Sequence, residues 1–244
     1  MRQLLPSPGF GDADLAALYA YPPGPWLRAN MVASADGAGH LEGVTATLSS
    51  KVDRRLFMLL RTLADVVLVG AGTVRAEGYG PARRSTRWHG HRGDRPPTPP
   101  IAVVSARLDL DPASRVFTAA PPHARTIVFT TAQAPAGRRA ELARHAEVIT
   151  AGEEAVDVTA AVRALADRGY QRMLTEGGPH LLAQLAAAGL LDDLCLTIAP
   201  LLTGPGAGRI VSGHEFPAGA LPLTLAHAVE EAGFLLCRYT RKTP

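Results

Sequence analysis

The sequence predicts an α/β protein built on a mainly parallel sheet with helices on both faces. Along the 244 residues, short apolar segments alternate with segments in which apolar residues recur every three or four positions. This alternation is typical of strand–helix–strand units. The last two strand-like segments, residues 223–231 and 233–241, have no helix between them, so the far edge of the sheet should be antiparallel. No linker separates compact blocks, which indicates a single domain over residues 26–244 with an N-terminal extension, residues 1–25.

The composition favours a globular protein with a large core, because 47% of the residues are hydrophobic. No apolar run is long enough to span a bilayer, since Arg61, Asp65 and Gln184 interrupt the longest ones. Near the start of the chain, Pro6 and Asp12 interrupt any signal-like core. We therefore expect a soluble, cytoplasmic protein without a membrane partner.

The cysteines predict neither disulfides nor a metal site. Cys195 and Cys237 are too few for a disulfide framework and show no metal-ligand spacing. Both lie in apolar strand-like segments, which indicates buried free thiols. The H-x-E and P-C-x-x-C motifs of zinc deaminases are absent from the sequence.

Basic charge is concentrated in one segment, residues 83–95. This segment has five arginines against Asp94, a local surplus of +4 in a chain whose net charge is +3. Because glycine and proline accompany the arginines, the segment is typical of a solvated surface loop. We therefore expect no nucleic-acid partner, although one arginine could contact a ligand phosphate. The arginines are Arg83, Arg84, Arg87, Arg92 and Arg95.

The N-terminal elements come in the order extension, strand, helix. The amphipathic segment DADLAALYA, residues 12–20, precedes YPPGP and predicts a surface appendage rather than a core element. Residues 26–34 alternate enough to form the first strand. Residues 49–64 predict a helix, because Ser50 and Asp53 resemble a capping box at its start. Its apolar face consists of Val52, Leu56, Leu59, Leu60 and Leu63.

The alternation continues through the rest of the chain. Asp157 is a suitable N-cap for a helix that Gly169 ends. The pair Gly177 and Gly178 opens the next helix directly after a strand. The further strands predicted are residues 65–70, 101–105, 126–131, 147–150, 170–176 and 194–202, and the further helices are residues 136–145, 157–169 and 177–190.

The segment VVLVGAGTVRAEGYG is a strand followed by a glycine loop. It contains Gly70-Ala71-Gly72, but Arg75 stands where a Rossmann fingerprint has its third glycine. The acidic residue that such a fingerprint requires after the next strand is also missing. The Rossmann interpretation is therefore weak. A phosphate-binding loop of another kind and a tight strand-to-helix turn are equally supported by the local sequence.

Two further features at strand ends indicate a phosphate ligand. The strand after the glycine loop ends at Ser105, and Arg107 follows; a hydroxyl and a guanidinium suit a ribose 2′-phosphate. Gly177 and Gly178 lie between a strand and a helix, where free N–H groups and the helix dipole would face an anion. Two such loops imply a pyrophosphate more strongly than one does. A glycine pair at a strand exit is otherwise a common steric feature.

Three carboxylates are candidates for chemistry. Asp53 lies in the first turn of a helix, where capping alone would explain it, and Asp36 lies in SADG, which is consistent with a simple turn. Glu176 ends a strand, and active-site groups gather at that edge of open α/β sheets. His180 either caps its own helix or reaches a ligand. The sequence contains no Ser-His-Asp arrangement, so we expect no covalent catalysis.

Three segments together resemble the riboflavin-biosynthesis reductase family: NMVASADGAGH, LFMLLRTLADVVLVGAGTVRAEGYG and LTEGGPHLLAQLAAAGLLDDLCLTIAPLLTG. The last two are specific, and the resemblance covers about residues 26–240. It is closest in kind to the reductase domain of the bifunctional deaminase–reductase, here in a stand-alone form. The resemblance implies a dihydrofolate-reductase-like fold, a mixed, mostly parallel sheet flanked by helices. It also implies NADPH as the cofactor and a homodimer.

The resemblance implies a site as well. Asp53 would orient the substrate or supply a proton, with Glu176 as a second catalytic polar group. Asn30 and Asp36 would contact the substrate. The reaction would be hydride transfer to C1′ of a ribosylamino-pyrimidine, 5-amino-6-(5-phosphoribosylamino)uracil. The cofactor contacts that it implies are Ser49, Gly70, Ala71, Gly72, Thr73, Ser105, Arg107, Gly177, Gly178 and Pro179.

The sequence departs from the family at the substrate pocket. Many bifunctional members have a lysine where this chain has Asn30, and ATLSSKVDRR differs from their usual pattern. Two alternatives therefore stay open. One keeps the fold and NADPH but reduces dihydrofolate or another pteridine, and the other is an NADP-binding sensor module without turnover.

Overall fold

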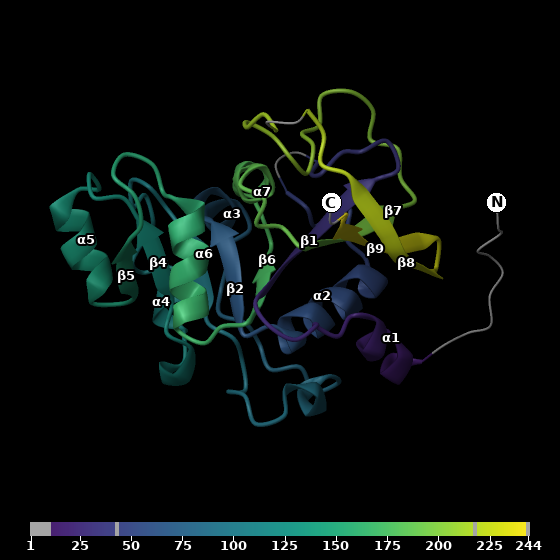
Figure 1. Cartoon of the computed structure of the whole chain (residues 1–244), viewed down its shortest axis with the longest axis horizontal. Coiled ribbons are helices and arrows are strands. Elements are labelled where there is room, and N and C mark those ends of the chain that lie inside the picture. The colour runs from purple at the N-terminus through teal and green to yellow at the C-terminus, as the bar shows by residue number, and fades with distance from the viewer. Residues whose placement is uncertain (1–10, 42–43, 217–218, 243–244) are drawn as a thin grey trace.

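The computed structural model describes residues 11–41, 44–216 and 219–242. Within these residues, nine strands form one sheet in the order β5-β4-β3-β2-β6-β1-β7-β9-β8. Every neighbouring pair from β5 to β7 is parallel, whereas β9 pairs antiparallel with both β7 and β8. The predicted mixed sheet with an antiparallel C-terminal edge is confirmed (Figure 1). The strands are β1 (Trp26–Ser34), β2 (Val66–Gly70), β3 (Ile101–Val104), β4 (Ile127–Thr130), β5 (Glu147–Thr150), β6 (Arg172–Thr175), β7 (Asp193–Ala199), β8 (Leu223–Glu231) and β9 (Phe234–Arg241).

Helices cover both faces of the sheet. Val67 and Val69 of β2 pack in a core with α1 to α5, whereas Val66 and Leu68 pack in a second core with α6 and α7. A strand buried on both faces reads as a continuous apolar run, which explains why β2 was easy to predict. Among the described residues, no helix is long and apolar enough to cross a membrane. The helices are α1 (Asp12–Leu18), α2 (Lys51–Leu63), α3 (Ala71–Ala76), α4 (Arg115–Thr118), α5 (Ala136–Ala143), α6 (Val158–Asp167) and α7 (Pro179–Ala187).

The N-terminal extension is not a surface appendage from α1 onward, and that expectation is wrong. Leu15 is 3% exposed and Tyr19 is fully buried, both in the core that contains α2. Arg28 of β1 forms a buried ion pair with Asp193 and donates a hydrogen bond to the Tyr19 carbonyl at 2.6 Å. Arg238 donates to the carbonyl of Leu18 at 2.8 Å. These two guanidinium groups fix the segment against the sheet.

The basic segment is likewise only partly a solvated loop. Trp88 is 1% exposed and Arg92 is 6% exposed. Arg92 donates to the carbonyls of Thr62 at 3.0 Å and Ala64 at 2.9 Å. The last carbonyls of a helix lack partners within the helix, so Arg92 satisfies the C-terminus of α2. Arg83 is exposed, as expected.

Candidate active site

The two glycine loops contact each other at the C-terminal edge of the sheet. Gly70 ends β2 and is also the N-cap of α3, so the strand passes directly into a helix. Gly177 and Gly178 follow β6, and the peptide bond between them is cis. The amide of Gly70 donates a hydrogen bond to the carbonyl of Gly177 at 2.7 Å. The loops therefore form one continuous surface.

This close approach requires glycine at residues 177 and 178. A Cβ on Gly178 would lie 2.6 Å from the Thr73 hydroxyl oxygen. Gly177 has φ +77°, and its Cβ would lie 3.3 Å from the Met31 side chain. At Gly72, by contrast, no atom lies within 4 Å of the Cβ position. An added side chain would therefore be strained at residues 177 and 178 of the second loop, but not at residue 72 of the first.

Three adjoining cavities lie along this surface, with volumes of about 320, 370 and 500 Å³, which we name the inner, central and outer pockets. Glu176 and Thr73 line both the inner and central pockets, and Gly70 and Gly72 line both the central and outer pockets. The residues proposed from sequence are distributed over all three pockets. The inner pocket is lined by Asn30, Ser49, Asp53, Thr73 and Glu176, and the central pocket by Gly178 and Pro179. The outer pocket is lined by Gly70, Ala71, Gly72, Ser105 and Arg107.

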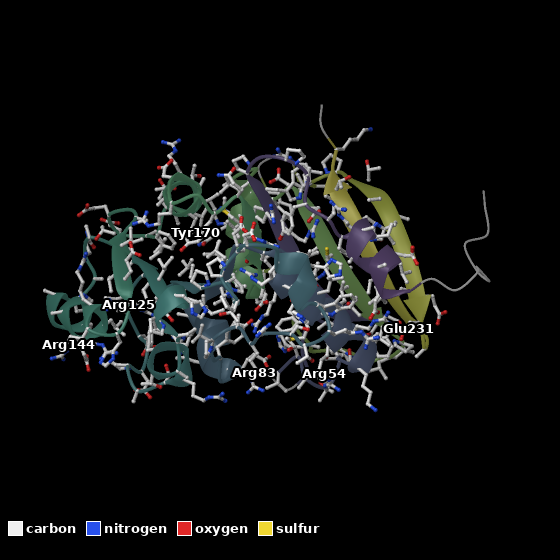
Figure 2. The ribbon with its side chains drawn as sticks, turned by 90° about the horizontal axis from the view of Figure 1, so that it is seen from below. Arg54, Arg83, Arg125, Arg144, Tyr170 and Glu231 are labelled. Carbon is white, nitrogen blue, oxygen red and sulfur yellow. The ribbon has the colours of Figure 1, made fainter. Side chains whose placement is uncertain are left out.

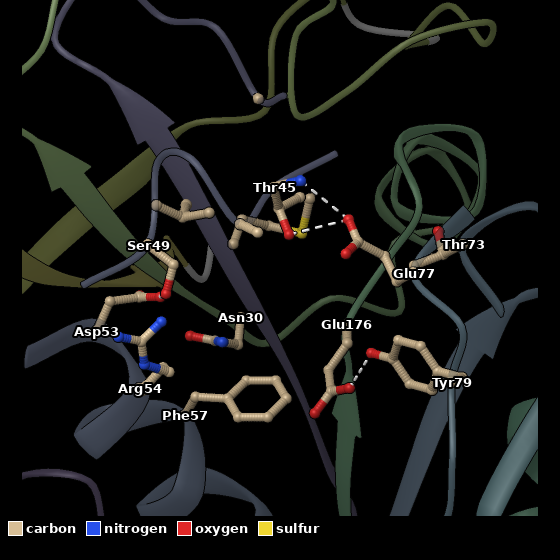
Figure 3. A pocket seen from close by; sticks show the side chains of 14 residues that line it. Asn30, Thr45, Ser49, Asp53, Arg54, Phe57, Thr73, Glu77, Tyr79 and Glu176 are labelled. Carbon is tan, nitrogen blue, oxygen red and sulfur yellow. Dashed lines mark hydrogen bonds between the residues drawn. The ribbon is translucent and has the colours of Figure 1, made fainter. Parts of the chain in front are cut away.

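Asp53 points into the inner pocket and is not needed for capping. Ser50, in an extended conformation, caps α2 by accepting from the amides of Val52 and Asp53. The Asp53 carboxylate instead accepts a hydrogen bond from the Ser49 hydroxyl at 2.6 Å. The side chain is buried against this wall, and Figure 3 shows it beside Ser49. The helix start thus presents a carboxylate held by a neighbouring hydroxyl.

Asn30 and Arg54 add an acceptor and a cation to the inner pocket. The side-chain oxygen of Asn30, on β1, is buried and has no hydrogen-bond partner within the part of the chain that the structure describes. Buried polar atoms are usually paired, so this oxygen is a candidate ligand contact. Arg54 follows Asp53 on α2, lines the pocket (Figure 3), and is exposed. Sequence reasoning missed Arg54.

Glu176 is held by two side chains. Arg61, on the last turn of α2, binds both carboxylate oxygens at 2.7 Å, and the Tyr79 hydroxyl donates to one of them. The Arg61 guanidinium also lies over the Phe57 ring at 4.2 Å. Burial alone would lower the pKa of Arg61, but the charge and hydrogen bonds of Glu176 outweigh it and raise that pKa. Burial, followed by the Glu176 charge, raises the pKa of Tyr79, which therefore stays protonated.

A hydrogen-bonded pair closes the side of the inner and central pockets. The Glu77 carboxylate accepts from the amide of Thr45 at 2.9 Å and from its hydroxyl at 3.0 Å. Thr45 lies in the loop after β1, and Glu77 follows α3 (Figure 3). Sequence reasoning missed this pair. Glu77 and Tyr79 stand in the RAEGYG segment just after the glycine loop. This position next to the loop is the sequence feature that could have indicated them.

Asp36 lies outside the three pockets. It follows β1 and accepts hydrogen bonds from the amides of Thr203 at 3.1 Å and Gly204 at 2.9 Å, and from the Ser34 hydroxyl. The Ser34 hydrogen bond, with those from Gly204 and Thr203, lowers the pKa of Asp36 to about 2. The structure thus gives Asp36 the turn role that the sequence left open, joining the loop after β1 to the loop after β7.

The outer pocket combines both signs of charge. Ser105 is buried, and Arg107 is exposed on the same wall. Asp109 and Glu154 also line the pocket, and Arg75 pairs with Asp109 at 3.4 Å. A ligand that extends from the central pocket would meet Ser105 and Arg107 at this end. Among the described residues there is no group of three or more His, Cys, Asp or Glu side chains suited to a metal ion.

The comparison with protein families decides the classification. Residues 25–232 match the model of the RibD C-terminal domain. The chain belongs to the RibD C-terminal domain family. This confirms the family resemblance inferred from the three sequence segments.

Relatives within the RibD C-terminal domain family are similar over most of the chain. One is the 2,5-diamino-6-ribosylamino-4(3H)-pyrimidinone 5′-phosphate reductase of Methanothermobacter thermautotrophicus, 29% identical over 89% of this chain and 99% of that protein. The reductase of the same name from Archaeoglobus fulgidus is 30% identical over 79% of this chain and 88% of that protein. A pyrimidine reductase-like protein from Corynebacterium diphtheriae has a similar structure, with TM-score 0.82 and 27% identity over 90% of this chain and 93% of that one.

Proposed function

We propose that this protein is an NADPH-dependent reductase of a ribosylamino-pyrimidinone 5′-phosphate. The pyrimidine would occupy the inner pocket, and the cofactor the central and outer pockets. The observation that carries the proposal is Glu176, fixed by Arg61 and Tyr79 on the wall common to the inner and central pockets. A hydride donor and acceptor must be neighbours, and these pockets adjoin at that wall. The names of the stand-alone relatives support the same activity.

The residues of the central and outer pockets fit NADPH. The first-turn amides of α3 and α7 lack partners within their helices and suit a pyrophosphate. Gly178 and Thr73 both line the central pocket, and their close approach leaves no room for a Cβ at residue 178. Ser105 and Arg107 provide a hydroxyl and a guanidinium for a ribose 2′-phosphate. When bound, the cofactor supplies the hydride.

The inner pocket suits a pyrimidine that carries several N–H donors. The free oxygen of Asn30 and the carboxylates of Asp53 and Glu176 are acceptors. A 2,5-diamino-pyrimidinone offers one more amino group to such a pocket than the corresponding uracil. We therefore favour the diamino substrate over 5-amino-6-(5-phosphoribosylamino)uracil. The exposed guanidinium of Arg54 is suited to the 5′-phosphate.

The carboxylates take different roles in this proposal. Both oxygens of Glu176 already accept from Arg61, and one also accepts from Tyr79, so we assign Glu176 to substrate orientation rather than proton donation. Among the described residues, the Asp53 carboxylate accepts one hydrogen bond, from Ser49. In the open-chain imine form of the substrate, hydride adds to C1′, the C1′=N double bond becomes a single bond, and we assign Asp53 to the proton that the nitrogen gains. Asp36 holds the loop after β7, and we assign it no substrate contact.

The test is a steady-state assay of NADPH oxidation with three substrates: the diamino-pyrimidinone ribosylamino phosphate, the corresponding uracil and dihydrofolate. We expect the highest kcat/KM with the diamino compound and a ribityl product by mass spectrometry. Turnover of dihydrofolate alone would replace the substrate assignment with the pteridine alternative. Tight NADPH binding with no turnover of any of the three would favour the sensor module.

We further propose that the protein is a homodimer. Leu201 and Leu202, which follow β7, are 43% and 83% exposed. Neighbouring large apolar side chains that are exposed to solvent are typical of association surfaces. Light scattering after gel filtration should give twice the chain mass, and Leu202→Asp should shift it towards the monomer. The cytoplasmic location stays a prediction.

A further inference from the structure

A fourth cavity, of about 390 Å³, lies at the N-terminal ends of the parallel strands, whereas the three pockets lie at their C-terminal ends. It adjoins the N-terminal ends of β2 and β6, at Asp65 and Arg172, whereas Gly70 and Glu176 stand at the other ends of these strands. Since β2 has five residues at ~3.3 Å each, roughly 16 Å separates the two ends. We name this cavity the basic cleft. Its charged or aromatic lining is Asp65, Arg92, Arg95, His123, Arg168, Tyr170 and Arg172.

The basic cleft has an excess of positive charge. Arg95 pairs with Asp65 at 3.2 Å, and Arg168 pairs with Glu147, from β5, at 2.8 Å. Asp65 is the only carboxylate on the described lining, and it also accepts the amide of Arg172 at 2.9 Å. No ion pair of the Arg172 side chain is found within residues 11–41, 44–216 and 219–242.

Arg92 adds a second uncompensated charge at this cavity. Its side chain is buried and binds only backbone carbonyls, those of α2 and of Pro96. The negative end of the α2 dipole offsets part of the cost of burying this cation. Burial, followed by the charges of Arg95 and Arg172, lowers the pKa of Arg92 to about 10. The three guanidinium groups therefore repel one another across the cleft.

An anion would relieve that repulsion. Guanidinium groups bind phosphate oxygens with paired, charge-assisted hydrogen bonds, and Arg172 retains its donors for this purpose. The Tyr170 hydroxyl, on the same wall (labelled in Figure 2), is a further donor, and its ring could lie against a base or sugar. The cavity is large enough for a small molecule rather than a single ion.

We propose that the basic cleft is a second ligand site, which binds a small molecule bearing a phosphate monoester or diphosphate. Its ligand is recognised by Arg172 and Arg168, with Arg92 and Arg95 providing the buried positive field. The site is separate from the proposed cofactor and substrate pockets. Because Arg92 contacts the C-terminal carbonyls of α2, the cleft adjoins the helix that carries Arg61 and Asp53.

Calorimetric titration of the NADPH-saturated protein tests the proposal, with inorganic phosphate, pyrophosphate and adenosine 5′-monophosphate as probes at constant ionic strength. Saturation with NADPH keeps the probes out of the central and outer pockets, where we place the cofactor. We expect a saturable site for pyrophosphate or the nucleotide, with phosphate weaker, whose affinity falls at least tenfold in Arg172→Gln. Arg83→Gln changes an exposed arginine that does not line the cleft, and this variant should bind the probes like the wild type.

Arg168→Gln is the second variant, because Arg168 is more exposed than Arg172 and its loss is less disruptive to folding. It should also weaken binding severalfold. Wild-type affinity in both variants would overturn the proposal, as would the absence of saturable binding in the wild type. Binding that is lost in Arg107→Gln but retained in Arg172→Gln would assign the ligand to the outer pocket and would equally overturn it.

Discussion

The amide of Gly70 donates a hydrogen bond to the carbonyl of Gly177 at 2.7 Å, which joins the loops that follow β2 and β6. The parallel pairing of these strands, with Leu68 opposite Thr175, brings the loops together. The glycines therefore serve two purposes at once. They allow the backbones to approach each other, and Gly70 and Gly178 line the central pocket without a side chain. A Rossmann fingerprint requires neither this contact nor a second glycine pair.

Gly178→Ala should destabilise the protein, whereas Gly72→Ala should not. The added methyl group would lie 2.6 Å from the Thr73 hydroxyl at residue 178, but meets nothing within 4 Å at residue 72. Overpacking of this kind costs about 1–3 kcal/mol, and a compatible Gly→Ala change in a helix stabilises by about 0.4–1 kcal/mol. Melting temperature should fall in the first variant only. Equal melting temperatures for the two variants would contradict the steric role given to residue 178.

Asp53→Asn should reduce turnover without loss of stability. Loss of a positioned proton donor lowers kcat about 100-fold or more. The matched control is Ser50→Ala, which removes the N-cap of α2 and should cost about 1 kcal/mol of folding free energy with kcat retained. Steady-state kinetics and thermal melts separate the two effects. If Ser50→Ala lost as much kcat as Asp53→Asn, helix geometry rather than the carboxylate would explain the loss.

The strands that position this site can be predicted from the sequence more readily than the contacts between the side chains that line it. β1, β2 and β6 are apolar segments bounded by polar or glycine residues, so local patterns suffice to find them. The clamp of Arg61 and Tyr79 on Glu176 joins segments far apart in the chain, and no local pattern reports such a contact. Proximity in space, not sequence, makes these residues a unit.

Two expectations failed for a related physical reason. The apolar stripe around Leu15 and Tyr19 is too short to be stable alone, and the sequence by itself predicts an appendage there. Its stability comes from tertiary packing and from Arg28, which pairs with Asp193 on the next strand of the sheet. The sequence likewise predicts that Arg92 is solvated. Its partners are the carbonyls that end α2, and a sequence does not show which side chain will satisfy a helix C-terminus.

Loss of Arg61 or Tyr79, which hold Glu176, should lower the folding stability. Removal of both charges, Arg61 and Glu176, should lower it less than loss of Arg61 alone. Arg61→Met leaves a buried carboxylate without its cation, which costs about 3–5 kcal/mol. Tyr79→Phe removes one hydrogen bond to that carboxylate and should cost about 1–3 kcal/mol. In Arg61→Met/Glu176→Leu, no charge remains unpaired, so stability should partly recover. Denaturant unfolding curves give these free energies of unfolding. A double variant less stable than Arg61→Met would contradict the clamp.

Stability should fall in acid through His227. Burial, followed by the charges of Arg238 and Arg28, lowers the pKa of His227 from 6.5 to about 4. The unfolded chain therefore binds this proton before the folded one does, and the stability present above about pH 6.5 is lost as the pH falls towards 4. His227→Phe keeps a ring at the Tyr19 edge contact and removes the titration.

Thermal melts between pH 7.5 and 5 measure this effect. The wild type should lose about 4 °C more than His227→Phe over this interval. His145→Gln changes an exposed histidine and should follow the wild type throughout. Parallel melting curves for the wild type and His227→Phe would contradict the assignment.

Cofactor preference should depend on Arg107. Its guanidinium and the Ser105 hydroxyl share a wall of the outer pocket, where only NADPH would carry a phosphate group. A charge-assisted hydrogen bond contributes about 1.5–3 kcal/mol, so Arg107→Gln should weaken NADPH binding about 10- to 100-fold and leave NADH binding unchanged. Arg84→Gln, in the exposed basic segment, is the charge-matched control and should affect neither. Fluorescence titrations measure the six affinities, and equal binding of NADPH and NADH by the wild type would remove the 2′-phosphate role of Arg107. In that case the acidic groups Asp109 and Glu154, which line the same pocket, would favour a free 2′-hydroxyl instead.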